Sequence, residues 1–252
     1  MYLKTATRGQ TTDYMMRFVT ALYEVRPGYW DSMFAEFLRL LEHLEGEIYV
    51  WTDRDFKHPP FSPRLRIHVL RRPLAAFETW SSIMGCSTVL HLPAQRNADK
   101  DTLEYIALMN CKAEMIWSVV PFLSTSTGPL VWIDAGIMKI FKGPTPNFKQ
   151  FQVASYATDK VTAPGCWSQV QGQGQGQDTR NSICWRFCGG ILVVPPALAT
   201  RLYNGCRDVL TTMFGSQQIA WEVNVWAELE ARDSSLFEWR SADHNERILM
   251  LK

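Results

Sequence analysis

The stretch GPLVWIDAGI (128–137) holds the clearest strand pattern in the chain. Its four consecutive apolar residues, 130–133, follow a Gly-Pro pair, which is typical of a strand that is buried on both faces of a sheet. Asp134 comes directly after them. Open α/β sheets bind their ligands at the carboxyl ends of strands, so Asp134 is a candidate site residue. Gly136 would let a ligand come close to the backbone there.

A strand–helix–strand unit precedes this stretch. MRFVTALY (16–23) is a short apolar run rich in β-forming residues. Gly28 opens a segment whose apolar residues recur at spacings of three and four up to Leu44, which predicts an amphipathic helix. EIYVWTD (47–53) follows as a second strand. The unit has the length of a right-handed parallel crossover, so we expect a mainly parallel sheet.

The rest of the chain continues the alternation of strands and helices. RLRIHVL (64–70) alternates like a strand, and residues 101–123 carry one long helical pattern. SICWRFCGGILVV (182–194) is expected to be a strand interrupted by two glycines, followed by helices over about 196–213 and 217–232. The pattern predicts a single α/β domain over 1–252, with residues 1–16 frayed. Residues 168–180, which contain QGQGQGQ, are predicted to form a flexible loop.

Composition excludes several classes of protein. The 26 Lys and Arg residues nearly cancel the 25 Asp and Glu residues, so the net charge is +1 and gives no bulk attraction for nucleic acid. The 46% hydrophobic content argues against disorder. No run of 18 apolar residues predicts a membrane span, and the first residues lack a signal-peptide core, so we expect a soluble, cytoplasmic protein. The six cysteines are too sparse for a disulfide scaffold and are expected to be reduced core thiols.

Four features could carry chemistry, and each has a structural alternative. Asp134 could bind a divalent ion that neutralises phosphate, or act as a capping or turn carboxylate. Gly189-Gly190 could let substrate lie against the backbone, or form a β-bulge. Glu222 could be a general base, or a solvated helix acid. His244 could complete a metal site, or be an exposed histidine near the end of the chain.

A local basic patch surrounds His68. It consists of Arg64, Arg66, Arg71 and Arg72. These arginines could bind nucleic acid as part of an adaptor, but the balanced net charge argues against that. They fit better on the solvated face of an edge strand, where charges prevent unwanted strand pairing.

Six segments together resemble the HtrL/YibB group of proteins, which is regarded as glycosyltransferase-like with a GT-A fold. VWIDAGI and LMNCKAE, which lies inside the third segment, are the most specific matches. The segments follow the family's order and are FVTALYEVR (18–26), IYVWTD (48–53), YIALMNCKAEMI (105–116), VWIDAGI (131–137), FCGGILVVP (187–195) and QQIAWEVNVW (217–226).

The resemblance implies a GT-A-like, Rossmann-like sheet with a nucleotide-sugar site at its strand ends. Thr20 and Ala21 would lie near the nucleotide base, with Asp53 after the second strand. Arg26 matches a basic position that closes the family's first motif. Asn110, together with Lys112, would face the ribose or the diphosphate.

The resemblance also places Asp134 where GT-A enzymes have the aspartate of their metal-binding D-x-D motif. This sequence has Asp-Ala-Gly there, with one carboxylate instead of two. A Mn²⁺ or Mg²⁺ ion at Asp134 would need help from His244 or from the nucleotide diphosphate itself. The literal D-x-D within WTDRD (51–55) lies at the second strand, where this fold usually binds the base.

The function that follows is sugar transfer from a nucleotide-diphosphate donor to a hydroxyl of a glycan or another acceptor. Asp134 with a metal ion, assisted by Lys112, would stabilise the departing diphosphate. Glu222 would take the proton of the acceptor hydroxyl. The alternative is a non-catalytic nucleotide-sugar or glycan-binding module of the same fold, which the single acid of Asp-Ala-Gly favours.

Overall fold

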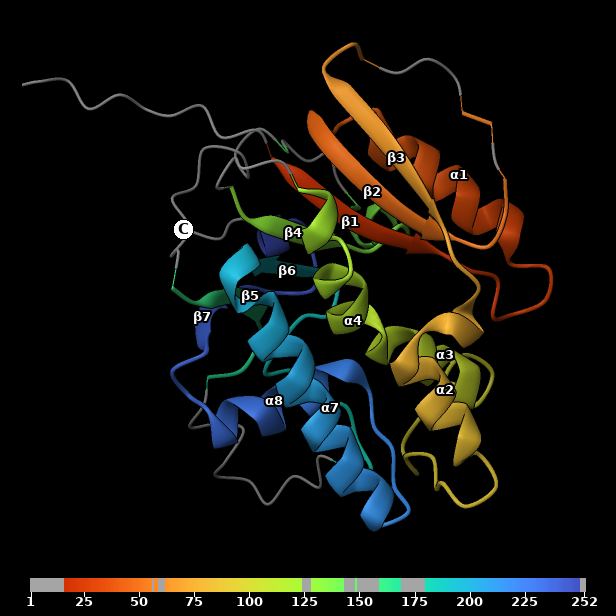
Figure 1. Ribbon diagram of the computed structural model, residues 1–252, viewed down its shortest axis with the longest axis vertical. Coiled ribbons are helices and arrows are strands. Elements are labelled where there is room, and N and C mark those ends of the chain that lie inside the picture. The colour runs from red at the N-terminus through yellow and green to blue at the C-terminus, as the bar shows by residue number, and fades with distance from the viewer. Residues whose placement is uncertain are drawn as a thin grey trace, which may run out of the picture.

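The computed structural model describes residues 16–55, 57–58, 62–123, 128–142, 148, 159–168 and 180–249 (Figure 1). The predictions for the N-terminal residues and for the QGQGQGQ loop fall almost wholly outside these ranges, so they stay predictions. Among the described residues, no helix is both long and apolar enough to cross a membrane.

Seven strands form one sheet with the order β3-β2-β1-β4-β6-β5-β7. The pairs β3–β2, β2–β1, β1–β4 and β5–β7 are parallel, whereas β6 runs antiparallel to both β4 and β5. The strands are β1 (Arg17–Leu22), β2 (Gly46–Thr52), β3 (Leu65–Arg71), β4 (Leu130–Ile133), β5 (Val161–Gly165), β6 (Ile191–Val194) and β7 (Phe237–Ser241). The predicted α/β fold with a mostly parallel sheet flanked by helices, and with β4 at its centre, is confirmed.

The predicted crossover at the start of the chain is also confirmed. Helix α1 (Trp30–Leu41) connects β1 to β2, whose residues pair in parallel from Arg17 with Glu47 onward. Gly46 begins β2 with a φ of +116°, and a Cβ there would lie 2.3 Å from the Met16 carbonyl oxygen. Only glycine meets both demands at this position.

Each face of the sheet packs against its own helices (Figure 1). One apolar cluster joins α1 to the strand residues that face it, and it includes Val131 and Ile133. The other joins the opposite strand face, with Leu130 and Trp132, to the remaining helices. These helices are α2 (Glu78–Gly85), α3 (Leu103–Asn110), α4 (Lys112–Trp117), α7 (Ala199–Gly215) and α8 (Glu222–Arg232). Alternate residues of β4 therefore serve two cores, which explains its continuous apolar run.

Short 3-10 helices fill the connections between these elements. They are η1 (Leu74–Ala76), η2 (Val120–Phe122), η3 (Ile137–Ile140), η4 (Pro196–Leu198) and η5 (Glu246–Leu249). All six cysteines are free thiols, as expected, and four of them are buried.

The single helix predicted over 101–123 is wrong, because it divides into α3, α4 and η2. The Asn110 side-chain amide donates to the Ile106 carbonyl oxygen at 2.9 Å. That oxygen is also the acceptor of the Asn110 backbone N–H in a helix, so the side chain competes with the helical bond at the last residue of α3. Cys111 forms a turn, and α4 begins immediately afterwards with Lys112.

Two further boundaries differ from the sequence prediction. Residues 182–190 form turns instead of a strand, because their backbone groups bond irregularly to other segments. The Cys184 N–H donates to Asn224 Oδ1 at 2.9 Å, for example, and the Cys188 N–H donates to the Pro164 carbonyl at 2.7 Å. The last predicted helix starts at Glu222 instead of 217, since Gln217 has a φ of +56° and pairs through its carbonyl with His91.

The basic patch lies along β3, which is an edge strand of the sheet, as expected. Each of its four arginines is near a carboxylate. The pairs are Arg64–Glu45 at 3.5 Å, Arg66–Glu47 at 3.8 Å, Arg71–Asp55 at 3.1 Å and Arg72–Glu114 at 3.7 Å.

Candidate functional site

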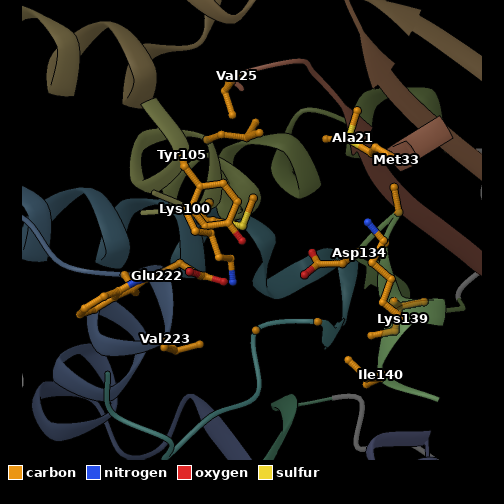
Figure 2. Close-up of a pocket in the computed structure, with 18 of the residues that line it drawn as sticks. Ala21, Val25, Met33, Lys100, Tyr105, Asp134, Lys139, Ile140, Glu222 and Val223 are labelled. Carbon is orange, nitrogen blue, oxygen red and sulfur yellow. The ribbon is translucent and has the colours of Figure 1, made fainter. Parts of the chain in front are cut away.

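A pocket opens where β1 and β4 end and where β6, which runs the other way, begins (Figure 2). Its volume is about 290 Å³, close to the ~300 Å³ at which small-ligand sites begin. The polar and aromatic residues that line it are Tyr23, Arg26, Tyr29, Lys100, Tyr105, Trp132, Asp134, Lys139, Trp185, Trp221, Glu222 and His244. The pocket therefore occupies the place at which open α/β sheets bind ligands.

A buried lysine joins two carboxylates at the floor of this pocket. Lys112 Nζ lies 2.9 Å from Asp134 Oδ1 and 2.8 Å from Glu222 Oε1, and it donates to the Gly189 carbonyl at 2.8 Å. Its side chain is only 1% exposed. Figure 2 shows the Asp134 and Glu222 side chains approaching from opposite sides, with the Tyr105 ring next to them. The three N–H groups of the ammonium are thus used by three protein partners.

Electrostatics keep Lys112 in its charged form. Burial alone would lower the pKa of its ammonium, but the charges of Asp134 and Glu222 outweigh burial and raise that pKa above its ordinary value. The cluster formed by Lys112, Asp134 and Glu222 therefore carries one net negative charge. We call it the Lys112 cluster.

The Gly189-Gly190 pair is explained by the close approach of site residues. A Cβ at Gly189 would lie 2.2 Å from Glu222 Oε1, and one at Gly190 would lie 2.6 Å from Ile137 Cδ1. The Gly190 carbonyl also accepts from the Asp134 backbone N–H at 2.9 Å. The two glycines therefore form a tight turn at the start of β6, and side chains larger than hydrogen would push the carboxylates apart.

Asp134 is fixed from two sides. Besides its ion pair with Lys112, Oδ1 accepts from the Trp132 indole N–H at 2.7 Å. Its side chain is 32% exposed, so it reaches the pocket. A divalent ion on this carboxylate would lie beside the Lys112 ammonium and be repelled by it.

The donor set therefore does not fit a resident Mn²⁺ or Mg²⁺ ion in this arrangement. No group of three or more His, Cys, Asp or Glu side chains within the described ranges could hold a metal ion. His244 lines the same pocket as Asp134. Burial lowers the pKa of its imidazole and the charge of Asp134 acts against that shift, but no hydrogen bond or ion pair joins the two residues among those described. A metal at Asp134 and His244 stays a prediction.

A group of cations and aromatic rings forms another wall of the pocket. The Arg26 guanidinium lies 4.1 Å from the centre of the Tyr29 ring and 5.1 Å from that of Tyr105. Lys139 lies 4.5 Å from the Tyr29 ring, and Lys100 lies 5.3 Å from the Tyr105 ring. We call this group the cation wall.

The structure brings most of the predicted site residues together. Those that line the pocket are Ala21, Arg26, Asp134, Gly189, Gly190, Glu222 and His244, and Lys112 lies directly beneath. Glu222 is buried at the start of α8 and is not a solvated helix acid.

Three predicted residues do not line the pocket. Thr20 is fully buried in β1, and its hydroxyl oxygen has no hydrogen-bond partner in the described part of the chain. Asp53 is exposed in a bend after β2. The Asn110 amide donates to the carbonyls of Ile106 and Ala220 at 2.9 and 3.0 Å, so its hydrogens are used inside the fold. Their proposed contacts with a nucleotide stay predictions.

Sequence reasoning missed the aromatic and lysine residues of the cation wall. Tyr105 had a usable signal, because it precedes Lys112 by seven residues and so lies on the same side of a helical pattern. Tyr29, Lys100 and Lys139 had none, since they come from the residue before α1, a turn before α3 and the 3-10 helix η3, which only the fold brings together.

The similarity of this chain to known proteins is low. No family model matches the chain, and no curated protein matches it. The apo crystal structure of mouse xyloside xylosyltransferase 1 is similar with a TM-score of 0.46 and 8% sequence identity, over 89% of this chain and 84% of that one.

Proposed function

We propose that this chain is a glycosyltransferase, which moves a sugar from a nucleotide-diphosphate donor to a hydroxyl of a glycan or another acceptor. The observation that carries this proposal is the pocket at the strand ends. It combines two fixed carboxylates, Asp134 and Glu222, with three cations that line the same pocket. Transfer needs both kinds of group, because a proton must leave the acceptor and negative charge develops on the departing diphosphate.

In the proposed reaction, the acceptor oxygen forms a bond to the anomeric carbon of the sugar. The bond from that carbon to the diphosphate breaks, and its electron pair leaves on the diphosphate. Glu222 takes the proton of the acceptor hydroxyl, as expected for a reaction that inverts the configuration. Lys112 holds Glu222 Oε1 at 2.8 Å and thereby fixes the carboxylate at the pocket.

The resemblance to the HtrL/YibB group supports the same class of reaction. On this view Ala21 lies near the nucleotide base, and Arg26 is the basic residue that closes the first motif. Both residues line the pocket. Membership of that group, and the roles of Thr20, Asp53 and Asn110 in it, stay predictions.

The test begins with thermal-shift screening against a panel of nucleotide sugars, because a ligand that binds only the native state raises the unfolding midpoint. The ligands that shift the midpoint are then assayed for donor hydrolysis and transfer. We expect Glu222→Gln to lower kcat by at least about 100-fold with little change in KM. Glu228→Gln is the matched control, since Glu228 lies on the same helix, is half exposed and forms its ion pair with Arg232.

Two results would contradict the proposal. If nucleotide sugars stabilise the protein but no hydrolysis or transfer occurs with any acceptor, the chain is the non-catalytic binding module. If Glu222→Gln and Glu228→Gln have the same activity as the wild type, Glu222 is not the base.

A further inference from the structure

The cation wall differs from the basic patch along β3 in lacking carboxylate partners. Arg26, Lys100 and Lys139 line the pocket, yet none of them forms an ion pair within the part of the chain that the structure describes. The arginines along β3 each have such a partner. Positive groups that line a pocket without partners attract anionic ligands.

The positions of these cations are fixed by the two tyrosines. Lys139 Nζ donates to the Tyr29 hydroxyl at 2.5 Å and to Ser32 Oγ at 3.4 Å. The same contact and charge lower the pKa of Tyr29. Stacking holds the Arg26 guanidinium between Tyr29 and Tyr105. The wall is therefore preorganised, and an anion that binds there orders few side chains.

Arg26 also carries a donor without an acceptor. Its Nε is buried and has no hydrogen-bond partner among the described residues. A buried donor without a partner costs free energy, so such groups in native proteins call for an explanation. A shift of the Arg26 side chain on binding would bring Nε to a ligand oxygen, and a phosphoryl group has several such oxygens.

The carboxylates of the pocket, by contrast, are already occupied. Lys112 contacts both Asp134 and Glu222, and its cluster keeps one net negative charge. The three cations of the wall exceed that charge, and the excess suits the two negative charges of a diphosphate diester. The side chains of the pocket therefore supply the positive charge that a bound metal ion would otherwise have to supply.

We propose that the cation wall binds the diphosphate of the donor directly and without a divalent metal ion, through Arg26, Lys100 and Lys139. This inference rests on the proposed function and deepens it. Neutralisation of the departing diphosphate is then supplied by side chains, and Asp134 serves with Lys112 to position Glu222.

The test measures binding calorimetrically with inorganic pyrophosphate and with UDP, GDP, ADP and CDP, first in EDTA and then with Mn²⁺. We expect pyrophosphate and at least one nucleoside diphosphate to bind in EDTA, and Mn²⁺ to change the Kd of that nucleotide by less than about threefold. Lys139→Met and Lys100→Met should each weaken binding about tenfold, as loss of one charge-assisted contact does. Lys57→Met is the control, because Lys57 is exposed and does not line the pocket.

Each failure has its own meaning. Binding of nucleoside diphosphates only with Mn²⁺ would overturn the metal-free site and leave the proposed function standing. Binding of pyrophosphate in EDTA, with no nucleoside diphosphate bound under either condition, would support the anion site and overturn the proposed function. If Lys139→Met and Lys100→Met bind like Lys57→Met, the anion binds elsewhere and the inference is wrong.

Discussion

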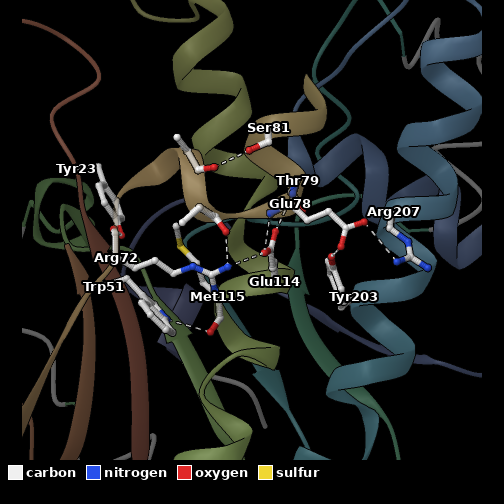
Figure 3. Close-up of polar contacts among 12 residues, drawn as sticks. Tyr23, Trp51, Arg72, Glu78, Thr79, Ser81, Glu114, Met115, Tyr203 and Arg207 are labelled. Carbon is white, nitrogen blue, oxygen red and sulfur yellow. Dashed lines mark hydrogen bonds and ion pairs between the residues drawn. The ribbon is translucent and has the colours of Figure 1, made fainter. Parts of the chain in front are cut away.

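The short helix α4 carries two buried charges, and they serve two different regions of the molecule. Lys112 faces the pocket and its cluster is open there. Glu114, two residues later, faces the start of α2, where its two oxygens accept from the backbone N–H groups of Glu78 and Thr79 at 2.9 and 2.8 Å. Arg72 lies 3.7 Å away (Figure 3). Glu114 is only 2% exposed, so this second cluster is closed.

The difference between the clusters separates a structural role from a functional one. Glu114 satisfies the first backbone donors of α2 and ties α4 to that helix, so its charge is used entirely inside the protein. The Lys112 cluster has more carboxylate than ammonium, and both of its acids line the pocket. A buried charge therefore indicates a ligand site only where its cluster keeps a net charge and some of its members line a pocket.

The largest expected effect is the loss of stability in Lys112→Met. This change leaves Asp134 and Glu222 without their cation, and breaking a buried ion cluster in this way costs about 3–5 kcal/mol. Urea denaturation gives the free energy of unfolding. Adding Glu222→Gln should restore part of the loss, because one of the two unpaired charges is removed. A loss below about 1 kcal/mol would mean that water reaches the cluster and that it does not organise the floor of the pocket.

The second effect is a loss of transfer in Asp134→Asn without a loss of stability. Asn keeps the size and an acceptor for the Trp132 indole, and Lys112 keeps Glu222 as its partner. We expect the unfolding midpoint to stay nearly unchanged. Transfer should fall by at least about 100-fold, or roughly 2.7 kcal/mol, because the Lys112 charge is then balanced by Glu222 alone, which makes that carboxylate a weaker base. A destabilised but fully active Asp134→Asn protein would place Asp134 with Glu114, among the structural carboxylates.

The third prediction concerns the closed cluster. Glu114→Gln removes the charge and one of the two acceptors, so the free energy of unfolding should fall by about 2 kcal/mol. Binding of pyrophosphate should not change, since Glu114 does not line the pocket. The same denaturation and calorimetric measurements apply. If Glu114→Gln weakened the binding of pyrophosphate and left the free energy of unfolding unchanged, the closed cluster would not have a purely structural role.

The sequence predicts the framework of the site better than its walls. The apolar run before Asp134 and the strand–helix–strand crossover at the start of the chain predict which strand ends lie together. Both features are visible in the sequence because strand patterns depend on local alternation and burial. Glu222 and His244 could be named as candidates, but nothing local shows that Glu222 meets Lys112 from 110 positions away. The end of α3 at Asn110, where the side-chain amide contacts the Ile106 carbonyl, is not revealed by helix periodicity either.

The smallest effect concerns tyrosines of the two regions and the pH dependence of stability. Tyr203 belongs to the closed region, where its hydroxyl donates to Glu78 Oε2 at 2.8 Å, whereas Tyr105 lines the pocket. Burial raises the pKa of both phenols above the ordinary value. The native state therefore holds these protons more tightly than the unfolded chain, whose tyrosines lose them near pH 10. The contribution to stability is complete below about pH 10 and is lost as the pH rises further.

Tyr203→Phe and Tyr105→Phe should therefore share one effect and differ in another. In both variants, stability should fall less steeply than in the wild type between pH 9.5 and 10.5, with about 0.4 kcal/mol less loss at pH 10, where an unfolded tyrosine is half ionised. At pH 7, Tyr203→Phe should lose about 1 kcal/mol with its hydrogen bond to Glu78. Tyr105→Phe should lose almost nothing, because no hydrogen bond holds its hydroxyl among the described residues. Urea denaturation at several pH values measures both effects. If Tyr105→Phe destabilises the protein at pH 7 as much as Tyr203→Phe, the Tyr105 hydroxyl is bound inside the fold and is not free to meet a ligand.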